Sequence, residues 1–531
     1  MFPRIFLLLA VPLVSIAAPL RAATKPNIVF ILCDDLGYGD VRCLNPQGKI
    51  ATPNMDRLAT DGMAFTDAHT SSAVCTPSRY AILTGRYNWR SRLQSGVLGG
   101  LSARLIEPGR VTVAQMLAEN GYATACIGKW HLGMDWAKQE GKSVNDLGIE
   151  TPAQAENVDY MKPIAKGPGS VGFQYYYGIS ASLDMVPNTF IENDHVTAAP
   201  TEKMDFPMTL GREEKKTTRK GPGAPGFTAI GVLPTLAQKA VDYIGQRAPE
   251  AKGGRPFFLY LPLNAPHTPI APSPEWQGRS GISPYADFVM ETDWAVGEVL
   301  KAIDAQGLGE NTLVMMASDN GCSPSANFPE LAAKGHNPSA QFRGYKADIY
   351  DGGHRVPFLA RWPGHIKAGT KSDQVVCLVD FFATCAEIAG VHVSDNMAED
   401  SVSLLPALLG TADHPLHEAI VHHSINGSFS IRQGNWKLEL CSGSGGWSDP
   451  KPNSAEAKKA PPVQLYDLSQ DIGERTNVQA EHTEVVDRLT RLLEKYIADG
   501  RTTPGVPQPN AVPIQLWKDN PTRPKGQPTA D

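Results

Sequence analysis

The sequence predicts an α/β protein built on a mixed, largely parallel sheet flanked by helices, with a smaller α+β unit at the C-terminal end. The first observation is a continuous apolar run at residues 28–32, typical of a strand covered on both faces. The second is that segments 122–127, 256–263 and 312–317 repeat this design. The third is that helical patterns separate the strands, at 53–62, 111–119, 233–247 and 287–305. Strands that alternate with helices favour parallel pairing.

Length and charge narrow the class of protein. The 531 residues are enough to bury a large core. The net charge of −6 argues against a nucleic-acid-binding protein, which usually has a marked basic excess. A local cluster of cations could still bind a small anion within this acidic chain.

The cysteines are too few for a disulfide framework in a chain of this length. Four of the eight have apolar neighbours and are expected to be buried thiols: Cys33, Cys126, Cys377 and Cys385. For Cys43, Cys322 and Cys441 the sequence leaves both pairing and a free thiol open.

Residues 1–23 have the pattern of a signal peptide. Arg4 precedes an apolar run at 5–14, and small residues follow up to Ala23. The alternative is a membrane anchor, but the run is too short to span a bilayer comfortably. We therefore expect a periplasmic or secreted protein that begins near Thr24, without a stable membrane span.

Polar residues follow each of the four predicted strands. Because ligands bind at the carboxyl ends of parallel strands, we expect these side chains to share one edge of the sheet. They are Asp34 and Asp35, then Lys129 and His131, then His267, and finally Asp319 and Asn320. Each alone could merely cap the next helix. Together, the carboxylate and amide oxygens suit Ca²⁺ better than zinc.

The segment Cys75-Thr76-Pro77-Ser78-Arg79 is the sharpest local motif. A short helical pattern follows it and ends at Gly85, and Pro77 suits an early helical position. Cys75 is therefore expected at a helix N-terminus, where free amides favour an anion. Arg79 lies one turn later and faces the same way.

This motif, followed by Leu-Thr-Gly-Arg at 83–86, resembles the signature of the formylglycine-dependent sulfatases, such as arylsulfatase A and N-acetylgalactosamine-6-sulfatase. The resemblance covers most of residues 24–480, including the segments 34–37, 128–133, 265–267, 318–321, 342–346, 351–357 and 465–468. It implies an alkaline-phosphatase-like fold with a smaller C-terminal sheet domain. It also implies a maturation enzyme that oxidises Cys75 to Cα-formylglycine.

The resemblance assigns roles to the residues at the strand ends. The Ca²⁺ ligands it implies are Asp34, Asp35, Asp319, Asn320 and the modified Cys75. Asp319 would help to deprotonate one hydroxyl of the hydrated aldehyde, which Arg79 braces. The family's mechanism also needs groups that bind sulfate and move protons: Lys129 and Lys346 for sulfate, His267 as donor to the leaving oxygen, and His131 as base for the second hydroxyl. Lys334 is a nearby competitor for the role of Lys346.

A change in sequence pattern after about residue 415 also divides the chain. Residues 24–415 would form the catalytic domain, with surface insertions at 136–228 whose charged cluster at 212–220 we interpret as a solvent-exposed face. Residues 416–502 would form the α+β subdomain, with strands at 419–424, 429–432, 436–440 and 463–468 and a helix at 484–498. Residues 503–531 would form a Pro-rich tail without a clear fold.

The substrate is the least determined feature. Segment 178–194 resembles carbohydrate sulfatases related to N-acetylgalactosamine-6-sulfatase, and Asp184 and His336 are candidate contacts to a sugar. Loop structure alone is the alternative for both. We predict hydrolysis of a sulfate ester on a terminal sugar, with galactose or N-acetylgalactosamine 6-sulfate favoured. The alternatives are a phosphonate or phosphodiester hydrolase, and a catalytically silent glycan-binding protein with unmodified Cys75.

Overall fold

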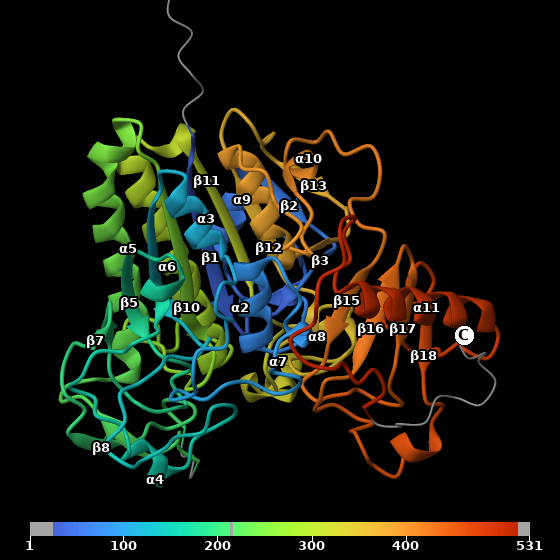
Figure 1. Cartoon of the computed structure of the whole chain (residues 1–531), viewed down its shortest axis with the longest axis horizontal. Coiled ribbons are helices and arrows are strands. Elements are labelled where there is room, and N and C mark those ends of the chain that lie inside the picture. Colours follow the sequence, from blue (N-terminus) through green and yellow to red (C-terminus); the bar gives the residue numbers. More distant parts are fainter. Residues whose placement is uncertain (1–24, 213–215, 519–531) are drawn as a thin grey trace, which may run out of the picture.

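A ten-stranded mixed sheet forms the centre of the larger part of the molecule (Figure 1). The computed structural model describes residues 25–212 and 216–518, so the predicted signal peptide lies outside the described residues. In chain order, the strands are β1 (Asn27–Asp34), β2 (Met63–Phe65), β4 (Ala123–Lys129), β5 (Tyr175–Ile179), β6 (Ile191–Glu192), β7 (His195–Val196), β10 (Phe257–Pro266), β11 (Thr312–Ser318), β12 (Phe358–Arg361) and β13 (Thr370–Ser372). Across the sheet they run β13-β2-β12-β11-β1-β10-β4-β5-β6-β7.

The four strands predicted from apolar runs occupy the middle of this sheet. β1 pairs in parallel with both β10 and β11, β10 pairs in parallel with β4, and β4 pairs in parallel with β5. The antiparallel pairs lie toward the edges, where β12 joins β11 to β2 and β6 joins β5 to β7. The prediction of a mixed, largely parallel sheet is confirmed.

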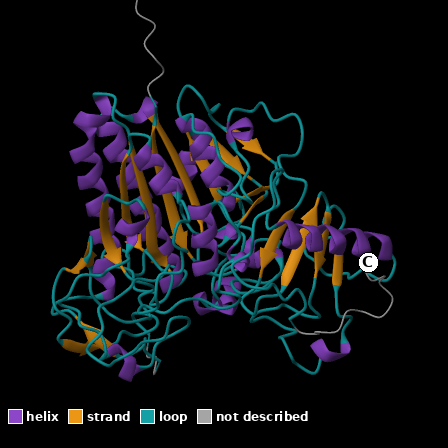
Figure 2. Ribbon diagram, viewed as in Figure 1, coloured by secondary structure: helices purple, strands orange, loops and turns teal. Residues whose placement is uncertain are grey.

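The apolar run of β1 divides its side chains between two cores. Ile28, Phe30 and Leu32 face the core that contains α2 (Cys75–Thr84), α3 (Val113–Glu119) and α9 (Phe381–Ala389). Val29 and Ile31 face the core that contains α1 (Pro53–Thr60), α5 (Ala229–Lys252) and α6 (Pro284–Ala305). Figure 2 shows helices packed on the sheet. Because both faces are covered, the strand needs an unbroken apolar sequence rather than an alternating one.

The predicted helices are present, with one clear difference in length. α5 extends beyond the predicted 233–247 at both ends, and the added turns bury Ala229, Val232, Ala248 and Ala251. α6 begins where Ser283 accepts a hydrogen bond from the Ala286 N–H. The remaining short elements of this part are β3 (Ala68–His69), β14 (Val376–Cys377), α7 (Phe328–Ala333), α8 (Asp351–His354) and α10 (Leu405–Leu408).

A four-stranded antiparallel sheet forms the C-terminal part, in the order β15 (Ile420–His423), β16 (Phe429–Gln433), β17 (Trp436–Glu439) and β18 (Gln464–Asp467). The helix α11 (Thr483–Asp499) packs on β16 and β17 and buries Leu489, Leu493 and Tyr496. These strands and this helix lie where the sequence predicts them. The prediction is possible because apolar residues recur at the period of a strand in the strands and at the period of a helix in α11.

The last described residues, 503–518, have no helix or strand. They nevertheless contact the folded chain, since Leu516 and Trp517 pack against the C-terminal core and the Ala511 N–H donates to the Arg90 carbonyl at 2.8 Å. The rest of the predicted tail lies outside the described residues.

Residues 136–228 only partly form the surface insertion that the sequence predicts, because β5, β6 and β7 lie within this segment and belong to the central sheet. The rest of the segment consists mainly of loops, with α4 (Pro152–Ala155), β8 (Glu202–Met204) and β9 (Gly221–Gly223) as short elements. The strand β1 starts at one end of the sheet, and Figure 1 shows α4 and β8 beyond the other end. The insertion therefore lies at the edge where the parallel strands end. Within the described residues, no helix has both the length and the apolar character needed to span a membrane.

Candidate active site

The polar residues at the four strand ends meet at one edge of the sheet, together with the first turn of α2 and the loop that carries Lys346. Asp34 is the last residue of β1, and Lys129 is the last residue of β4. Asp319 directly follows β11, and its N–H donates to the Cys33 carbonyl at 3.1 Å. The parallel register of the central strands is what brings these residues together.

Two buried lysines neutralise two neighbouring carboxylates. Lys129 Nζ lies 2.6 Å from Asp34 Oδ2, and Lys346 Nζ lies 2.7 Å from Asp35 Oδ1. Burial penalises the charged forms on both sides. For Lys346, the Asp35 carboxylate outweighs this penalty and raises the pKa of the ammonium. For Asp34, Lys129 outweighs it and holds the pKa of the carboxyl well below its usual range.

Asp319 is bound by Arg79 from α2. The guanidinium donates to Asp319 Oδ2 from Nε at 2.9 Å and from Nη2 at 2.7 Å, and both side chains are fully buried. Burial raises the pKa of Asp319 to about 6, and the neighbouring Asp34 carboxylate acts in the same direction against Arg79. The charged form of Asp319 is therefore less stable than that of Asp34.

The unpaired oxygens of this cluster fit a hard divalent cation. Asp34 Oδ1 and Asn320 Oδ1 are buried without a hydrogen-bond partner. Asp34, Asp35 and His267 also offer ligand atoms that lie within 4.8 Å of one another. Asp35 adopts a left-handed backbone (φ +64°), which Asp tolerates better than most residues and which ends the strand abruptly. Buried oxygens that lack donors are the ligands that Ca²⁺ prefers.

Cys75 is the first residue of α2 and is 2% exposed. Burial raises the pKa of its thiol, although the nearby Lys129 and Lys346 lower it in part. An unmodified thiol here is therefore protonated at neutral pH and weakly nucleophilic. The position suits a nucleophile, whereas the thiol itself does not.

His131 has one ring nitrogen held and one free. Nε2 lies 2.8 Å from the Leu98 carbonyl and donates to it, and the buried Nδ1 has no hydrogen-bond partner. Burial, reinforced by Lys129 and Arg79, holds the pKa of His131 well below its usual range. The ring is neutral with a lone pair on Nδ1, which is the form required of a base.

His267 follows β10 and is oriented by its own backbone neighbour. Nδ1 donates to the Thr268 carbonyl at 2.6 Å, and Nε2 lies 3.7 Å from Asp35 Oδ2. Its side chain is 8% exposed, more than those of Lys129 and Asp34, which are fully buried. His267 is therefore placed nearer the solvent side of the cluster.

Sequence patterns did not identify the group that orients His131. Thr76 Oγ1 accepts a hydrogen bond from the Leu98 N–H at 3.2 Å, and the Leu98 carbonyl then accepts from His131. The second residue of the cysteine motif thus fixes a backbone carbonyl 22 residues later. A backbone group has no sequence signal of its own, so only the spatial arrangement reveals it.

The remaining candidates lie in different surroundings. Lys346 reaches Asp35, whereas its competitor Lys334 is exposed at the end of α7. His336 is 1% exposed, with Nε2 at 2.8 Å from Asp40 Oδ1 and Nδ1 accepting from the Lys49 N–H at 3.2 Å. Both ring nitrogens are engaged, so His336 offers none to a sugar in this arrangement.

Asp184 lies on the loop after β5. Its Oδ2 accepts from Arg219 at 2.8 Å, and its Oδ1 is buried without a hydrogen-bond partner. The Ser180 carbonyl of the same loop accepts from the His131 N–H at 2.9 Å. Asp184 therefore lies four residues after Ser180, whose carbonyl contacts the catalytic cluster through His131.

Comparisons with known proteins identify the family of the chain. Residues 26–391 match the Sulfatase family model, and residues 345–439 match the model of the N-sulphoglucosamine sulphohydrolase C-terminal region. The chain is 33% identical to N-acetylgalactosamine-6-O-sulfatase of Bacteroides thetaiotaomicron, over 88% of this chain and 93% of the relative. It is also 33% identical to human arylsulfatase A, over 93% of this chain and 92% of the relative.

The chain also resembles a solved structure from Bacteroides thetaiotaomicron, described in connection with the metabolism of multiple glycosaminoglycans by that organism. The two structures superpose with a TM-score of 0.75 and are 33% identical in sequence. The superposition covers 89% of this chain and 99% of the other. The expected alkaline-phosphatase-like architecture is confirmed by these sulfatase neighbours. The chain therefore belongs to the sulfatase family and hydrolyses sulfate esters.

Proposed function

We propose that this sulfatase removes sulfate from a sulfated carbohydrate, with galactose or N-acetylgalactosamine 6-sulfate favoured, and that its nucleophile is a formylglycine made from Cys75. The observation that carries the proposal is the position of Cys75. It lies at the start of α2, within the electrostatic influence of Lys129, Lys346 and Asp319. Cys33 and Cys322 also lie near the carboxylates, but the main influences on their thiols include one cluster cation each, Arg79 and Lys346, whereas those on Cys75 include both Lys129 and Lys346.

A Ca²⁺ ion is the cofactor that the cluster supports best. Asp34, Asp35, Asp319 and Asn320 would hold it, together with the oxygen of modified Cys75. When bound, it would stabilise negative charge on the sulfate oxygens and on the nucleophile. The two orphaned oxygens, Asp34 Oδ1 and Asn320 Oδ1, support this assignment because a cation would satisfy both.

Formylglycine would supply chemistry that the buried thiol cannot. Its hydrate has two hydroxyls, one to attack sulfur and one whose deprotonation expels sulfate and restores the aldehyde. Asp319, whose pKa is raised to about 6, would accept the first proton. Arg79, fixed on Asp319, would hold the hydrate in position.

Two lysines would bind the sulfate group. Lys129 and Lys346 reach the cluster through different carboxylates, Asp34 and Asp35 respectively. As compact point cations they suit sulfate oxygens, whose charge is spread over several atoms. The elevated pKa of Lys346 keeps it charged throughout turnover.

The two histidines would move protons at different stages. His267, with Nδ1 held by Thr268, can present a protonated Nε2 to the leaving oxygen of the sugar. His131, neutral and with a free Nδ1, would remove the proton from the second hydroxyl. Their different environments support opposite roles, since burial and cations keep His131 neutral while His267 lies beside Asp35.

The carbohydrate assignment rests on the named relatives and on Asp184. A bacterial relative is named N-acetylgalactosamine-6-O-sulfatase, and the Asp184 Oδ1 is a buried acceptor free to bind a sugar hydroxyl. A screen of defined sulfated mono- and oligosaccharides tests the assignment. We expect 6-sulfated galactose or N-acetylgalactosamine to give the highest kcat/KM, and faster turnover of steroid sulfates would overturn it.

Two other functions remain to be separated from this one. A phosphonate or phosphodiester hydrolase could use the same cysteine motif, and faster hydrolysis of phosphate esters than of sulfate esters would establish it. A silent glycan-binding protein would keep Cys75 unmodified and bind sulfated sugars without turnover. We also propose a periplasmic or secreted location, because residues 1–23 have the pattern of a signal peptide, and a formylglycine-generating maturation enzyme as partner.

A further inference from the structure

Three histidines meet where the C-terminal sheet joins the larger part of the molecule. They come from β3, α8 and β15, which lie close together in Figure 1, and they are His69, His354 and His422. All three side chains are fully buried, and each offers a ring nitrogen within 4.8 Å of the other two. The proposed mechanism uses none of them, so their chemistry is separate from that of the carboxylate cluster.

The contact between the rings of His69 and His354 brings two acceptors together. His69 Nε2 lies 2.7 Å from Asp67 Oδ1, and His354 Nε2 lies 2.9 Å from the Ile349 carbonyl oxygen. Carboxylate and carbonyl oxygens can only accept, so both rings carry their proton on Nε2. The two Nδ1 atoms, 3.0 Å apart, then face each other with lone pairs. Two acceptors at this distance repel unless a cation lies between them.

Lys437 does not supply that cation, nor does it change the proton on His354. Its Nζ lies 3.1 Å from His354 Nε2. However, its three N–H groups already have acceptors at 2.6–3.0 Å, which are the Ile349 carbonyl, Asp351 and Glu474. The ammonium is therefore satisfied and neutralised without the ring.

Arg432 is satisfied in the same way. Its Nη1 lies 3.0 Å from His69 Nε2, but the guanidinium donates to both oxygens of Asp67, at 2.7 and 2.8 Å. A proton shared between the two Nδ1 atoms would require a charged ring. Burial, reinforced by Lys437, opposes this by holding the pKa of His354 well below its usual range. A metal ion is the cation that remains.

His422 supplies a third nitrogen. Its Nδ1 lies 3.0 Å from Ser430 Oγ, to which it can donate, and its buried Nε2 has no hydrogen-bond partner. An unpartnered buried nitrogen of this kind is costly, and a metal ion would satisfy it. Each ring then has one nitrogen free and the other held by a carboxylate, a carbonyl or a hydroxyl, which is the arrangement typical of metal-binding histidines.

The ligand type and the spacing suit Zn²⁺. Imidazole nitrogens are common zinc ligands, and a tetrahedral zinc ion holds two of them about 3.3 Å apart. The two Nδ1 atoms of His69 and His354 are close to this separation. The ring of His422 stacks on that of His354 with 12° between the planes. Because a metal lies in the plane of each ring that binds it, His422 must rotate out of this stack when it binds.

We propose that His69, His354 and His422 supply three of the four ligands of a structural Zn²⁺ ion. The ion joins β3 and α8 of the larger part to β15 of the C-terminal sheet. It lies beside the segment that leads to α2, in which the Ala73 N–H donates to the His423 carbonyl at 2.9 Å. The ion therefore fixes the C-terminal sheet against this segment.

The first experiment measures the zinc content of the full-length chain, of His422→Gln and of His423→Gln. All are expressed with added zinc and purified in excess Ca²⁺, which occupies the carboxylate cluster, where Asp34, Asp35 and His267 could also bind zinc. His423 is the next residue of β15 and is also buried, so it controls for the loss of a buried histidine. We expect His422→Gln to hold about one zinc ion per chain less than the other two proteins. Equal zinc in all three, or no zinc in the wild type, would overturn the proposal.

A second measurement needs no substitution that could impair folding. A zinc chelator, added at constant excess Ca²⁺, should lower the Tm of the wild type and of His423→Gln, and added zinc should restore it. A wild-type Tm that does not respond would show that the histidines bind no structural metal.

Co²⁺ in place of zinc identifies the ligands, because its visible absorption reports tetrahedral nitrogen coordination. These bands should be present in the wild type and lost in His69→Gln and His354→Gln. Bands that persist in both variants would contradict the proposed ligands. None of these readouts requires turnover, so the zinc proposal can fail while sulfatase activity is intact, and the reverse.

Discussion

Arg79 donates two hydrogen bonds to a single carboxylate oxygen of Asp319, from Nε at 2.9 Å and from Nη2 at 2.7 Å. Both side chains are fully buried. Within the described residues, the other oxygen, Oδ1, accepts only one hydrogen bond, from the Asp35 N–H at 3.3 Å. One oxygen of Asp319 is thus neutralised by the protein, and the other faces the carboxylate cluster.

This pairing predicts a large loss of stability on removal of Arg79. Arg79→Ala would leave Asp319 buried without its cation, which costs about 3–5 kcal/mol in comparable buried pairs. The measurement is urea unfolding of Arg79→Ala and of Arg104→Ala. Arg104 is a useful control because its side chain makes a long hydrogen bond at an exposed position. A loss below about 1 kcal/mol for Arg79→Ala would contradict the importance of the pair.

Calcium should stabilise the folded chain. A cation that binds the folded state alone raises the free energy of unfolding by about 2.7 kcal/mol at a hundredfold excess over Kd. We therefore expect the Tm to rise with added Ca²⁺ and to fall with a chelator, and Asp35→Asn to reduce the shift. Asp194→Asn, a change at an exposed carboxylate, should keep the full shift. An identical response of wild type and Asp35→Asn would exclude Asp35 as a ligand.

A second buried cluster predicts acid sensitivity. His69, His354 and His422 are fully buried where β3 and α8 meet β15, and the rings of His354 and His422 stack at 3.8 Å. Burial lowers the pKa of all three. Charged groups also face them: Asp67, Asp351, Arg432 and Lys437.

The direction in which stability changes with pH follows from these lowered pKa values. The unfolded chain takes up protons near pH 6.5, about where an ordinary histidine titrates, whereas the folded chain does not. Stability is therefore lost as the pH falls below about 6.5, by about 1.4 kcal/mol per pH unit for each neutral ring. Unfolding measured from about pH 7.5 to about pH 5 should show this slope. His422→Phe keeps the stacked ring and should make the slope shallower, unlike the exposed control His195→Phe. An unchanged slope in His422→Phe would contradict the account.

Thr76 should affect catalysis through His131. Thr76→Val removes the acceptor for the Leu98 N–H while it keeps the shape of the side chain. Because the Leu98 carbonyl then loses its fixed position, we expect kcat to fall about tenfold with KM little changed. Thr76→Ser should restore the rate. Conversion of Cys75 must be equal in all three proteins, and an unaltered kcat in Thr76→Val would show that His131 is held by other contacts.

The strand ends could be predicted because their chemistry is local in sequence. Asp34, Lys129 and Asp319 each follow an apolar strand, and parallel pairing alone brings such ends together. His336 illustrates what local patterns omit. The sequence makes His336 a candidate sugar contact, but its two partners, Asp40 and the Lys49 backbone, are distant in the chain and occupy both ring nitrogens.

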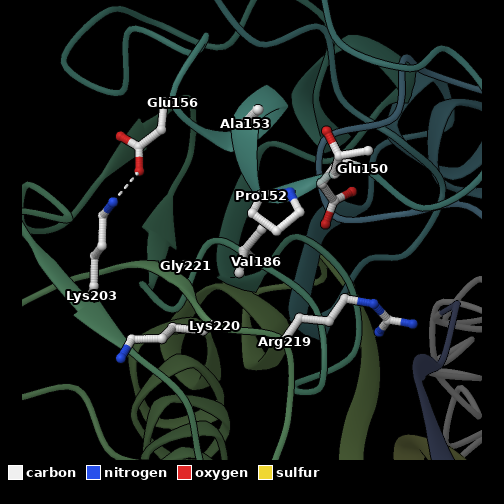
Figure 3. A pocket seen from close by; sticks show the side chains of 10 residues that line it. Glu150, Pro152, Ala153, Glu156, Val186, Lys203, Arg219, Lys220 and Gly221 are labelled. Carbon is white, nitrogen blue, oxygen red and sulfur yellow. Dashed lines mark ion pairs between the residues drawn. The ribbon is translucent and has the colours of Figure 1, made fainter.

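The pocket of about 690 Å³ lined by Glu150, Val186, Arg219 and Lys220 (Figure 3) could not be predicted from the sequence for a different reason. A cluster of charges at 212–220 is typical of a solvent-exposed face, and composition cannot show which of its members lines a cavity. Arg219 and Lys220 do so because Asp184 and the short strand β9 hold them against Val186 and Glu150. Loop insertions depend on such long-range contacts, which periodicity does not encode.

The most direct test of the central claim is intact mass measurement of the peptide that contains Cys75, from protein purified in active form. Oxidation of the thiol to the aldehyde lowers the peptide mass by about 18 Da. We predict that this species is present, that its fraction scales with specific activity across preparations, and that Cys75→Ser folds but has almost no turnover. Fully active protein in which Cys75 remains an unmodified thiol would contradict the assignment of the nucleophile.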